Sequence, residues 1–553
     1  MILDSKIEIL SQSGSLDVDI TSIVFDSRAV CAGSLFFALP GTHTTGNVFI
    51  SDAILRGAAA VIFEGEIDSK DESKIRAVLC EQKKDVPLIR VPNARYAMAP
   101  ISAAFFENPS HSLAVIGVTG TEGKSSTVSF VWQFLKLLGH KAGFISTVQY
   151  STGGEAQSNP EHTTTPEAPV IQARLREMVE NGCEFAVLET SSHGLSKKLN
   201  RTGNIEFDCG IFMNVTLEHL EFHGTFEQYR DDKANLFRKL DECSHEKSIC
   251  GTKKIVPSFG IVNLEDESAP YFIQATKQSV LGFTTEGRAG RSAAEGTDAA
   301  PLPPLPRGVP FVLARNIATA RFGLTFDMTE PNAIDEHARP LPKKVIRVKS
   351  SVSGAFNAYN IMAAILAVSR LTGTSPEEIA PLSEKLVPVK GRMTTIDNGQ
   401  PFELIVDYAH TPSSFETIFP PIRRRCSGKM ICVFGSGGER DTEKRPLQGK
   451  IAARFCDTVI LSNEDPRNED EMKILEDIAV GARLEGKKDG EDLFLIPDRT
   501  KAIRAALSRA KNDDIVLLLG KSHENSIISK DGAHPYDEIR EAESALCELG
   551  YNG

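Results

Sequence analysis

A short glycine-rich loop carries the clearest chemistry in this sequence. Its residues are Gly120, Thr121, Glu122, Gly123, Lys124, Ser125 and Ser126. The two glycines let the backbone approach phosphate oxygens. Lys124 can reach the outer phosphates of a nucleotide, and Ser125 or Ser126 can meet Mg²⁺. The loop therefore predicts a site for the phosphates of ATP, which we expect to drive the formation of a new bond.

The predicted elements on either side place this loop as such a site requires. A buried strand is predicted at residues 113–118 and a helix at 125–138, where apolar residues recur at helical spacing. The start of a helix directs free N–H groups and the positive end of its dipole toward an anion. Two residues depart from the usual pattern: Val118 stands where the strict pattern has Gly, and Glu122 adds a carboxylate. We expect Glu122 either to point into solvent or to lie near Mg²⁺.

Composition narrows the class of protein. The chain has 553 residues, 41% of them hydrophobic and 25% charged, with a net charge of −12. Such an acidic balance does not suit general binding to nucleic acid or anionic lipid, so neither is expected as a partner. No secretory signal and no apolar run of about 18 residues is present, which predicts a cytoplasmic protein without a membrane span. The ten cysteines are scattered and we expect reduced thiols, although Cys243, His245 and Cys250 leave a metal site as an alternative.

The order of predicted elements indicates an α/β protein of three domains. Residues 1–110 read as a small α/β domain, with a helix predicted at 51–57. Residues 111–389 alternate strands and helices, which predicts a mainly parallel sheet, and their stretch at 285–310 reads as a flexible insertion rich in Gly, Ala and Pro. Residues 390–553 are predicted to form a third α/β domain.

Polar residues follow the predicted strands of the third domain. In an open parallel sheet, ligands bind beyond the carboxyl ends of the strands, so we expect a site there. The strands predicted in this domain are 404–406, 430–434, 458–461 and 515–519. Those predicted earlier in the chain, besides 113–118, are 34–39, 58–63, 185–188 and 209–212.

With Thr127, the glycine-rich loop reads GTEGKSST and resembles the GTNGK(T/S) loop of the Mur ligase family. Further segments resemble the branch that adds the third amino acid to the peptidoglycan precursor UDP-MurNAc-L-Ala-D-Glu, the MurE-type ligases, over nearly the whole chain outside the insertion. The resemblance implies an N-terminal uridine-nucleotide-binding α/β domain, a central P-loop ATPase-like parallel sheet and a C-terminal Rossmann-like α/β domain. It also implies an ATP-dependent amide-bond ligase that works through an acyl phosphate, in a monomeric cytoplasmic protein.

For the UDP-MurNAc-dipeptide, the resemblance rests on the segments FDSR, THT, TTPE and ETSSHGL. Arg201 is placed by counting back from residues 206–208. The residues implied to bind this substrate are Phe25, Ser27, Thr42, His43, Thr44, Thr164, Thr165, Ser191 and Arg201.

Resemblance also assigns the ATP and metal residues. Lys124, Glu189, His219 and Lys233 are implied to be catalytic, with Lys233 carbamylated. The implied Mg²⁺ ligands are Ser125, Glu189 and His219. The segment NVTLEHLEFHG carries His219, with Glu at 218 and 221 where the family has Asp. The segments GAFNAYN, GRM and DYAHTP add residues that face the nucleotide: Asn360, Arg392, Asp407 and His410.

The incoming amino acid is assigned to the segments FGSGGERD, EDPR and GKSHE, with Ser522 in place of a family Gly. The implied residues are Arg440, Glu464, Asp465, Pro466, Arg467, Gly520 and Glu524. Where the family adds meso-diaminopimelate the second segment reads DNPR, and its Arg pairs with the distal carboxylate. Asp465 replaces that Asn, and an extra carboxylate favours a plain ammonium, as in lysine or ornithine. Alternatively Asp465 pairs with Arg467 and removes it from recognition, and diaminopimelate stays a candidate.

Other interpretations remain open at this stage. A MurF-type ligase or a folylpolyglutamate synthase would share the phosphate loop, but the nucleotide segment at 26–28 argues against the folate enzyme and the amino-acid segments argue against MurF. The Glu substitutions and Ser522 motivate a different class, a catalytically weakened nucleotide-binding protein descended from the family.

Overall fold

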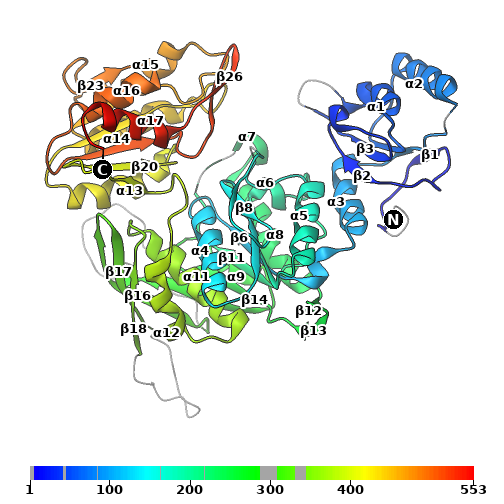
Figure 1. Cartoon of the computed structure of the whole chain (residues 1–553), viewed down its shortest axis with the longest axis horizontal. Coiled ribbons are helices and arrows are strands. Elements are labelled where there is room, and N and C mark those ends of the chain that lie inside the picture. Colours follow the sequence, from blue (N-terminus) through cyan, green and yellow to red (C-terminus); the bar gives the residue numbers. More distant parts are fainter. Residues whose placement is uncertain are drawn as a thin grey trace. The chain divides into compact units, whose positions relative to one another are not determined.

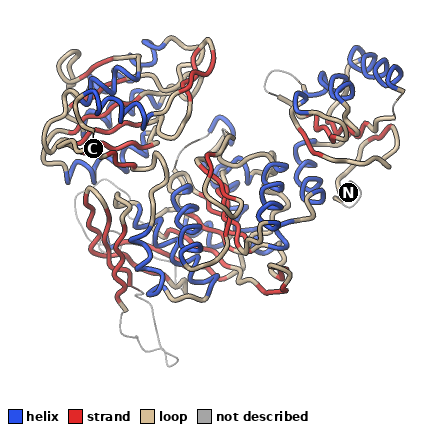
Figure 2. The backbone as a smooth tube through the Cα atoms, viewed as in Figure 1, coloured by secondary structure: helices blue, strands red, loops and turns tan. Residues whose placement is uncertain are grey.

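The computed structural model describes residues 5–41, 45–83, 85–161, 163–216, 218, 220–286, 308–329 and 344–552. The chain divides into two compact units, Met1–Lys124 with Leu135–Leu281 and Ser125–Phe134 with Gly282–Gly553. Strands and helices alternate through both units (Figures 1 and 2), which confirms the expected α/β class. Most of the insertion predicted at 285–310 lies outside the described residues.

The N-terminal domain is a five-stranded sheet with the strand order β1-β5-β4-β3-β2. Its strands are β1 (Ser11–Ser13), β2 (Ser22–Val24), β3 (Ser34–Ala38), β4 (Ala60–Phe63) and β5 (Leu88–Arg90). All neighbours pair in parallel except β1, which is antiparallel to β5. Alternate residues of β3 face opposite ways. Phe36 packs with helices α1 (Ile50–Arg56) and α2 (Ser69–Gln82), and Phe37 packs with α3 (Ala94–Phe105).

The first unit also holds five neighbouring parallel strands of the central sheet, in the order β14-β11-β6-β10-β7. These strands are β6 (Ala114–Thr119), β7 (Ala142–Ile145), β10 (Phe185–Glu189), β11 (Cys209–Phe212) and β14 (Phe259–Asn263). The antiparallel strands β8 (Gln149–Ser151) and β9 (Gln157–Ser158) extend it beyond β7. The prediction of a mainly parallel sheet is confirmed.

Helices cover this sheet closely. In the first unit they include α5 (Ala168–Glu180), α8 (Phe226–Glu242) and α9 (Ala269–Gln274). At Gly117 in β6, an added Cβ would lie 2.5 Å from Leu236 of α8 and 2.9 Å from Phe207, so only glycine allows the observed approach. This tight packing fixes α8 beside the strand that leads into the glycine-rich loop.

Strands that the sequence did not predict lie around the start of the second unit's long segment, Gly282–Gly553. Strand β15 (Ser279–Thr285) pairs in parallel with β16 (Phe311–Ala320), which continues antiparallel into β17 (Gly323–Thr329) and β18 (Val345–Ser350). Exposed and buried residues alternate along β18, as in a strand with one solvated face. The buried helix α11 (Asn357–Thr372) packs on this part of the sheet.

The C-terminal domain has a six-stranded sheet in the order β19-β20-β24-β21-β22-β23. Its strands are β19 (Thr394–Ile396), β20 (Glu403–Asp407), β21 (Met430–Phe434), β22 (Thr458–Leu461), β23 (Leu493–Leu495) and β24 (Ile515–Leu519). All pair in parallel except β19. The core on one face takes in α13 (Pro412–Arg425), α14 (Lys444–Phe455) and α15 (Glu471–Leu484), and the core on the other takes in α16 (Arg499–Leu507) and α17 (Glu538–Glu548). The four strands predicted here are confirmed.

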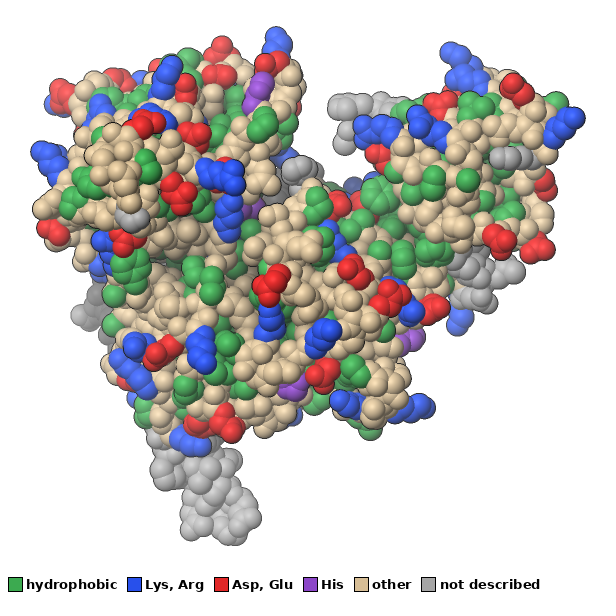
Figure 3. All heavy atoms as spheres, viewed as in Figure 1, with side chains coloured by type: hydrophobic (Ala, Val, Ile, Leu, Met, Phe, Trp, Pro, Cys, Tyr) green, Lys and Arg blue, Asp and Glu red, His purple; other side chains and the backbone are tan. Residues whose placement is uncertain are grey.

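The surface is mixed in charge. Acidic and basic side chains are interspersed over the face seen in Figure 3. Among the described residues, no helix is long and apolar enough to cross a membrane.

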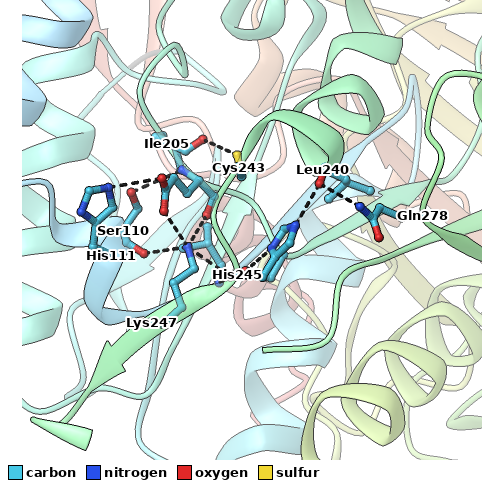
Figure 4. Close-up of polar contacts among 11 residues, drawn as sticks. Ser110, His111, Ile205, Leu240, Cys243, His245, Lys247 and Gln278 are labelled. Carbon is cyan, nitrogen blue, oxygen red and sulfur yellow. Dashed lines mark hydrogen bonds and ion pairs between the residues drawn. The ribbon is translucent and has the colours of Figure 1, made fainter. Parts of the chain in front are cut away.

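A buried polar network lies at the amino ends of the central parallel strands, opposite the end that leads into the glycine-rich loop. From β12 (Glu246–Ile249), the fully buried Lys247 ammonium reaches the carbonyl of Ser110 (3.0 Å), the carbonyl and carboxylate of Glu206 (3.3 Å each) and the Asp208 carboxylate (3.6 Å) (Figure 4). Burial alone would raise the pKa of Glu206, but the hydrogen bond from His111 and the charge of Lys247 lower it to about 2.

His245 belongs to the same network. Its Nδ1 pairs with Asp208 (2.8 Å), which raises the pKa of the imidazole, and its Nε2 lies 2.9 Å from the Leu240 carbonyl (Figure 4). Both ring nitrogens are therefore used within the protein. The alternative of a metal site built from Cys243, His245 and Cys250 is wrong.

We predict that Lys247→Met lowers the free energy of unfolding by about 3 kcal/mol, because the buried Asp208 carboxylate and the half-buried Glu206 carboxylate both lose the lysine ammonium. Denaturant unfolding at neutral pH measures the loss. Lys253→Met on the neighbouring strand β13 (Thr252–Ile255) is the control, since its side chain is 84% exposed and its ion pair contributes little. Equal stability of the two variants would contradict the role given to Lys247.

Candidate functional site

The glycine-rich loop follows β6, and residues 213 to 216 hold its shape. Gly120 and Gly123 take positive φ angles of 157° and 82°. The side-chain oxygen of Asn214 accepts hydrogen bonds from the backbone N–H groups of Thr121 (3.0 Å) and Glu122 (2.8 Å). The Asn214 amide nitrogen donates to the Glu122 carbonyl (3.3 Å). Asn214 begins the segment NVTLEHLEFHG, and nothing in the sequence indicated its role in holding the loop.

Two lysine side chains donate hydrogen bonds to backbone carbonyls of this loop. The ammonium of Lys124 donates to the Thr121 carbonyl (2.7 Å), and that of Lys233, buried on α8, donates to the Gly120 carbonyl (2.8 Å). The Lys233 ammonium also lies 4.4 Å from the centre of the Tyr229 ring. Burial, together with the charge of Lys124, holds the pKa of Lys233 well below its usual value.

Nearby carboxylates act on the pKa of Lys233 in the direction opposite to burial, since they raise it. The charges of Glu218, Glu122 and Asp232 each favour the protonated lysine, but burial outweighs them. Glu122 is half-buried, so its side chain is not fully in solvent, and its charge is close enough to act on Lys233. The structure therefore brings Glu122 into the electrostatics of the loop.

Tyr229 forms a second contact between α8 and the glycine-rich loop. Its hydroxyl lies 3.1 Å from the Thr121 hydroxyl, which also accepts from the backbone N–H of Thr216 (3.0 Å). The helix that carries Lys233 is thus bonded directly to the residues expected to surround phosphate. A tyrosine four residues before a lysine on a helix is the only signal that the sequence offered for this contact.

Glu189 ends β10 as a buried and firmly held carboxylate. Its Oε2 accepts from the Thr147 N–H (2.8 Å) and its Oε1 from the Thr147 hydroxyl (3.0 Å). The Thr165 hydroxyl donates to the Glu189 carbonyl (3.0 Å) and accepts from the Ser191 N–H (2.9 Å). Glu189, Thr165 and Ser191 therefore form one connected group at the carboxyl end of the sheet, and Thr147 is a member that sequence reasoning missed.

Arg201 joins the same group. It donates to the Thr165 carbonyl (2.9 Å) and to Glu167 (2.8 Å). The Arg201 Nε and the Glu167 Oε2 are buried and have no hydrogen-bond partner among the described residues. Thr164 is half-buried beside Thr165.

The N-terminal domain holds the remaining residues assigned to the uridine nucleotide. Phe25 packs against the core beneath β3, and Ser27 opens a short 3-10 helix that Asp26 caps. Thr42, His43 and Thr44 lie outside the described residues, as does His219.

In the second unit, Asn360 is buried on α11. Its side-chain oxygen accepts from the Thr127 hydroxyl (3.2 Å), and its amide nitrogen donates to Asn357 (2.8 Å). Thr127 lies in the first turn of α4 (Lys124–Leu137), directly after the glycine-rich loop. Asn360 thus links α11 to the helix that begins at the loop.

Aromatic and cationic side chains gather after β20. The Arg392 guanidinium lies 4.6 Å from the centre of the Tyr408 ring, and that ring is 4.7 Å from each of the His410 and His523 rings. Asp407 accepts from the N–H groups of Met393 (2.7 Å) and Ala409 (2.8 Å), while burial raises its pKa. The Arg392 Nε and the His523 Nδ1 are buried without a partner in the described part of the chain. Tyr408 and His523 belong to the motifs DYAHTP and GKSHE, which by themselves indicate no role for either residue.

The residues assigned to the amino acid follow β21, β22 and β24. Asp465 pairs with the buried Lys521 (2.8 Å), so the alternative in which it pairs with Arg467 is wrong. Lys521 also contacts Glu524 (2.5 Å), whose other oxygen accepts from the Tyr408 hydroxyl (3.2 Å). The backbone N–H of Arg467 donates instead to the Ile528 carbonyl (3.0 Å).

The glycines of this site allow close contact between loops. A Cβ added to Gly438 would lie 2.0 Å from the carbonyl oxygen of Pro466, and one added to Gly520 would lie 3.1 Å from the Glu464 carboxylate. Arg440 extends from the first of these loops and is exposed. Its free position suits an Arg that receives a ligand carboxylate.

Ser522, the departure from the family pattern, has a structural explanation. It adopts a positive φ of 51°, the conformation that the expected glycine would favour, and its hydroxyl donates to the Gly391 carbonyl (2.5 Å). Gly391 itself has φ +72°, and a Cβ there would lie 1.9 Å from the Ser522 oxygen. The serine therefore fastens the GKSHE loop to the start of the C-terminal domain.

A glycine-rich phosphate loop beside a parallel sheet, followed by a second α/β domain with its own site, defines a multidomain nucleotide-binding protein. Three family models match the chain: the Mur ligase family catalytic domain at residues 19–106, the Mur ligase middle domain at 118–368 and the Mur ligase glutamate ligase domain at 391–522. The chain therefore belongs to the Mur ligase family.

Individual relatives agree over nearly the full length. UDP-N-acetylmuramyl-tripeptide synthetase of Treponema denticola is 47% identical, covering 98% of this chain and 96% of the relative. The protein of the same name from Treponema pallidum is 46% identical, covering 96% and 94%. A solved UDP-N-acetylmuramoyl-L-alanyl-D-glutamate–2,6-diaminopimelate ligase has a TM-score of 0.57 at 24% identity and covers 97% of each chain, which supports the fold.

We predict that Asn214→Ala weakens ATP binding by about tenfold, because the Glu122 N–H loses its acceptor and the loop loses its fixed shape. Titration calorimetry with ATP measures the change. Asn181→Ala is the control, since that amide bonds the Thr152 carbonyl elsewhere in the same unit. Unchanged ATP affinity in Asn214→Ala would refute a role in shaping the loop.

Proposed function

We propose that this chain is an ATP-dependent amide-bond ligase that adds a diamino acid to UDP-MurNAc-L-Ala-D-Glu during synthesis of the peptidoglycan precursor. The diamino acid is L-lysine, L-ornithine or meso-diaminopimelate. The observation that carries the proposal is the pair of lysines that contact the glycine-rich loop: Lys124 donates to the Thr121 carbonyl, and the buried Lys233 of α8 donates to the Gly120 carbonyl. The names of the relatives support the substrate, and the working location that we propose is the cytoplasm, with the protein a monomer.

The proposed reaction has two steps. The γ-carboxylate of the D-Glu residue attacks the γ-phosphate of ATP, which forms an acyl phosphate and releases ADP. The amine of the diamino acid then attacks the acyl carbon, and phosphate leaves as the amide forms. Because anions must approach each other, the main task is to neutralise charge. Lys124 supplies a cation on the loop, and Asn214 and Thr121 hold the loop in position.

The donor chemistry at the carboxyl end of the central sheet fits Mg²⁺, which prefers oxygen ligands. Glu189 offers a carboxylate that Thr147 orients, and Ser125 offers a hydroxyl at the start of α4. We propose these two residues and His219 as its ligands. Bound there, Mg²⁺ would neutralise phosphate charge.

Carbamylation of Lys233 is the modification that we propose. A lysine amine reacts with CO₂ in its neutral form, losing one proton as the N–C bond forms, and burial favours that neutral form of Lys233. The product is an anion that can no longer donate to the Gly120 carbonyl as an ammonium does, so the modification changes how α8 meets the loop.

The three substrates are assigned to three domains, residues 1–110, 111–389 and 390–553. The connected group around Glu189, Thr165 and Arg201 supports the sugar-peptide assignment, because buried atoms of Arg201 and Glu167 lack partners there. The unpartnered Arg392 and His523 atoms support a ligand site in the third domain.

Phosphate release from ATP tests the activity. We expect release only when UDP-MurNAc-L-Ala-D-Glu and a diamino acid are both present, with lysine, ornithine and meso-diaminopimelate supplied separately. Mass spectrometry of the product identifies the added residue. Release with none of the three would sink the ligase proposal and leave a nucleotide-binding protein without this activity.

The carbamate is tested at Lys233. Lys233→Ala is expected to lose at least about 100-fold in kcat, because the carboxylate that would help to position Mg²⁺ is lost, and added acetate or formate is expected to restore part of it. Lys239→Ala is the matched control, since Lys239 lies on the same helix and also donates to a backbone carbonyl, that of Gly203. A fully active Lys233→Ala enzyme would contradict the assignment. So would an inactive Lys233→Ala enzyme in which acetate and formate restore neither the rate nor substrate binding.

A further inference from the structure

The carboxylate of Glu167 lies between two arginines that are more than 100 residues apart in the sequence. Its Oε1 accepts one hydrogen bond from the guanidinium of Arg201 (2.8 Å) and another from the guanidinium of Arg95 on α3. The three side chains are only 12% to 21% exposed, so these contacts are largely out of solvent. Arg95 has no role in the reaction proposed above.

Both arginines are held close to Glu167 by the backbone around them. Asn93 caps α3, because its side-chain oxygen accepts from the Tyr96 N–H (2.7 Å), and this fixes the helical turn that carries Arg95. The amide of Asn200, next to Arg201, donates to the Tyr96 carbonyl (3.2 Å). The start of α3 and the segment at 200–201 are therefore joined directly as well as through Glu167.

The pairing at Glu167 is incomplete on both sides. A guanidinium and a carboxylate can form two parallel hydrogen bonds, but both arginines here donate to the same oxygen. The Glu167 Oε2 and the Arg201 Nε are buried and have no hydrogen-bond partner among the described residues. The Glu167 side chain also makes no hydrogen bond to the N-terminus of α5, although Glu167 directly precedes that helix. Arg201 therefore keeps donor capacity that this carboxylate does not use.

A ligand carboxylate at this point would compete with Glu167 for Arg201. Arg201 also donates to the Thr165 carbonyl (2.9 Å), and Thr165 belongs to the connected group that we propose to hold the sugar-peptide. If Arg201 turned from Glu167 to a ligand, a largely buried carboxylate would lose a partner, and leaving such a charge unpaired is costly. Arg95 keeps Glu167 paired, so it reduces the cost of that exchange.

We propose that Arg95 is a positioning residue for the sugar-peptide substrate: it retains Glu167 while Arg201 exchanges this internal carboxylate for a carboxylate of the D-Glu residue. The proposal rests on the ligase function proposed above. No covalent bond changes in this step, only the partner of one guanidinium. Glu167 competes with the substrate in this arrangement, and Arg95 weakens the competition.

The effect of losing Arg95 should therefore depend on the residue at position 167. In Arg95→Gln the carboxylate of Glu167 keeps only its contact with Arg201, so the exchange for a substrate carboxylate becomes less favourable. Glu167→Gln removes the competing charge, and Arg201 can then turn to the substrate whether or not Arg95 is present. Loss of Arg95 is thus expected to be costly only where Glu167 is kept.

The test is a double-mutant cycle in the full-length protein, with binding measured by titration calorimetry. The ligands are UDP-MurNAc-L-Ala-D-Glu and UDP-MurNAc-L-alaninamide, which ends before D-Glu and has no carboxylate. Arg95→Gln is expected to weaken binding of the first ligand about tenfold and to change binding of the second by less than about twofold. Glu167→Gln is expected to bind the first ligand at least as tightly as the wild type, and adding Arg95→Gln to it is expected to change that affinity by less than about twofold.

Two further variants separate this role from simple damage. Arg95→Lys is expected to retain most of the affinity, because Arg95 uses a single nitrogen, and Arg76→Gln on α2 is the control, since that side chain is 76% exposed. A loosened α3 would weaken both ligands alike. Equal weakening of the two ligands, no effect of Arg95→Gln, or an equal effect of it with and without Glu167 would overturn the proposal. A wild-type protein that binds neither ligand, or that releases no phosphate with any amino acid, would instead overturn the ligase function.

Discussion

The contact between a buried lysine and the backbone of a phosphate loop is the constraint on which the central domain depends. Lys233 can reach the Gly120 carbonyl only because α8 packs tightly on β6, and that packing requires glycine at 117. Tyr229 and Thr121 add a second bond between the same two elements. Burial of a lysine disfavours its charge, and this depression of the pKa is the property that a reactive amine needs.

In the C-terminal domain the main electrostatic feature is the pairing of charged side chains at the ends of the strands. Carboxylates and cations lie close together at the ends of its strands, and several of them pair with one another. Arg499 is satisfied by Glu538, and Lys521 by Asp465 and Glu524, so that Glu464 keeps an open oxygen. Selective pairing of this kind gives a buried site a defined charge.

Much of the fold could be predicted because its signals are local. The buried strands at 113–118, 185–188 and 515–519 are short apolar runs, and each appears within a residue or two of its predicted place. Strands β16 to β18 were missed because they lie next to the Pro-rich insertion, and the alternation of exposed and buried residues along β18 signals only a half-buried strand. Thr147 and Asn214 were missed for another reason: each acts through a hydrogen bond to a residue distant in sequence.

The sequence by itself determined the class of this protein, because the glycines, lysines and acids of its motifs are fixed by type and order along the chain. It also located the candidate residues for each substrate. Only the tertiary structure decided their partners. Asp465 and Lys521 are 56 residues apart, and Asn214 lies more than 90 residues from the loop it holds. Which ion pair forms depends on distances in the folded protein, where burial strengthens one contact and removes its competitors from water.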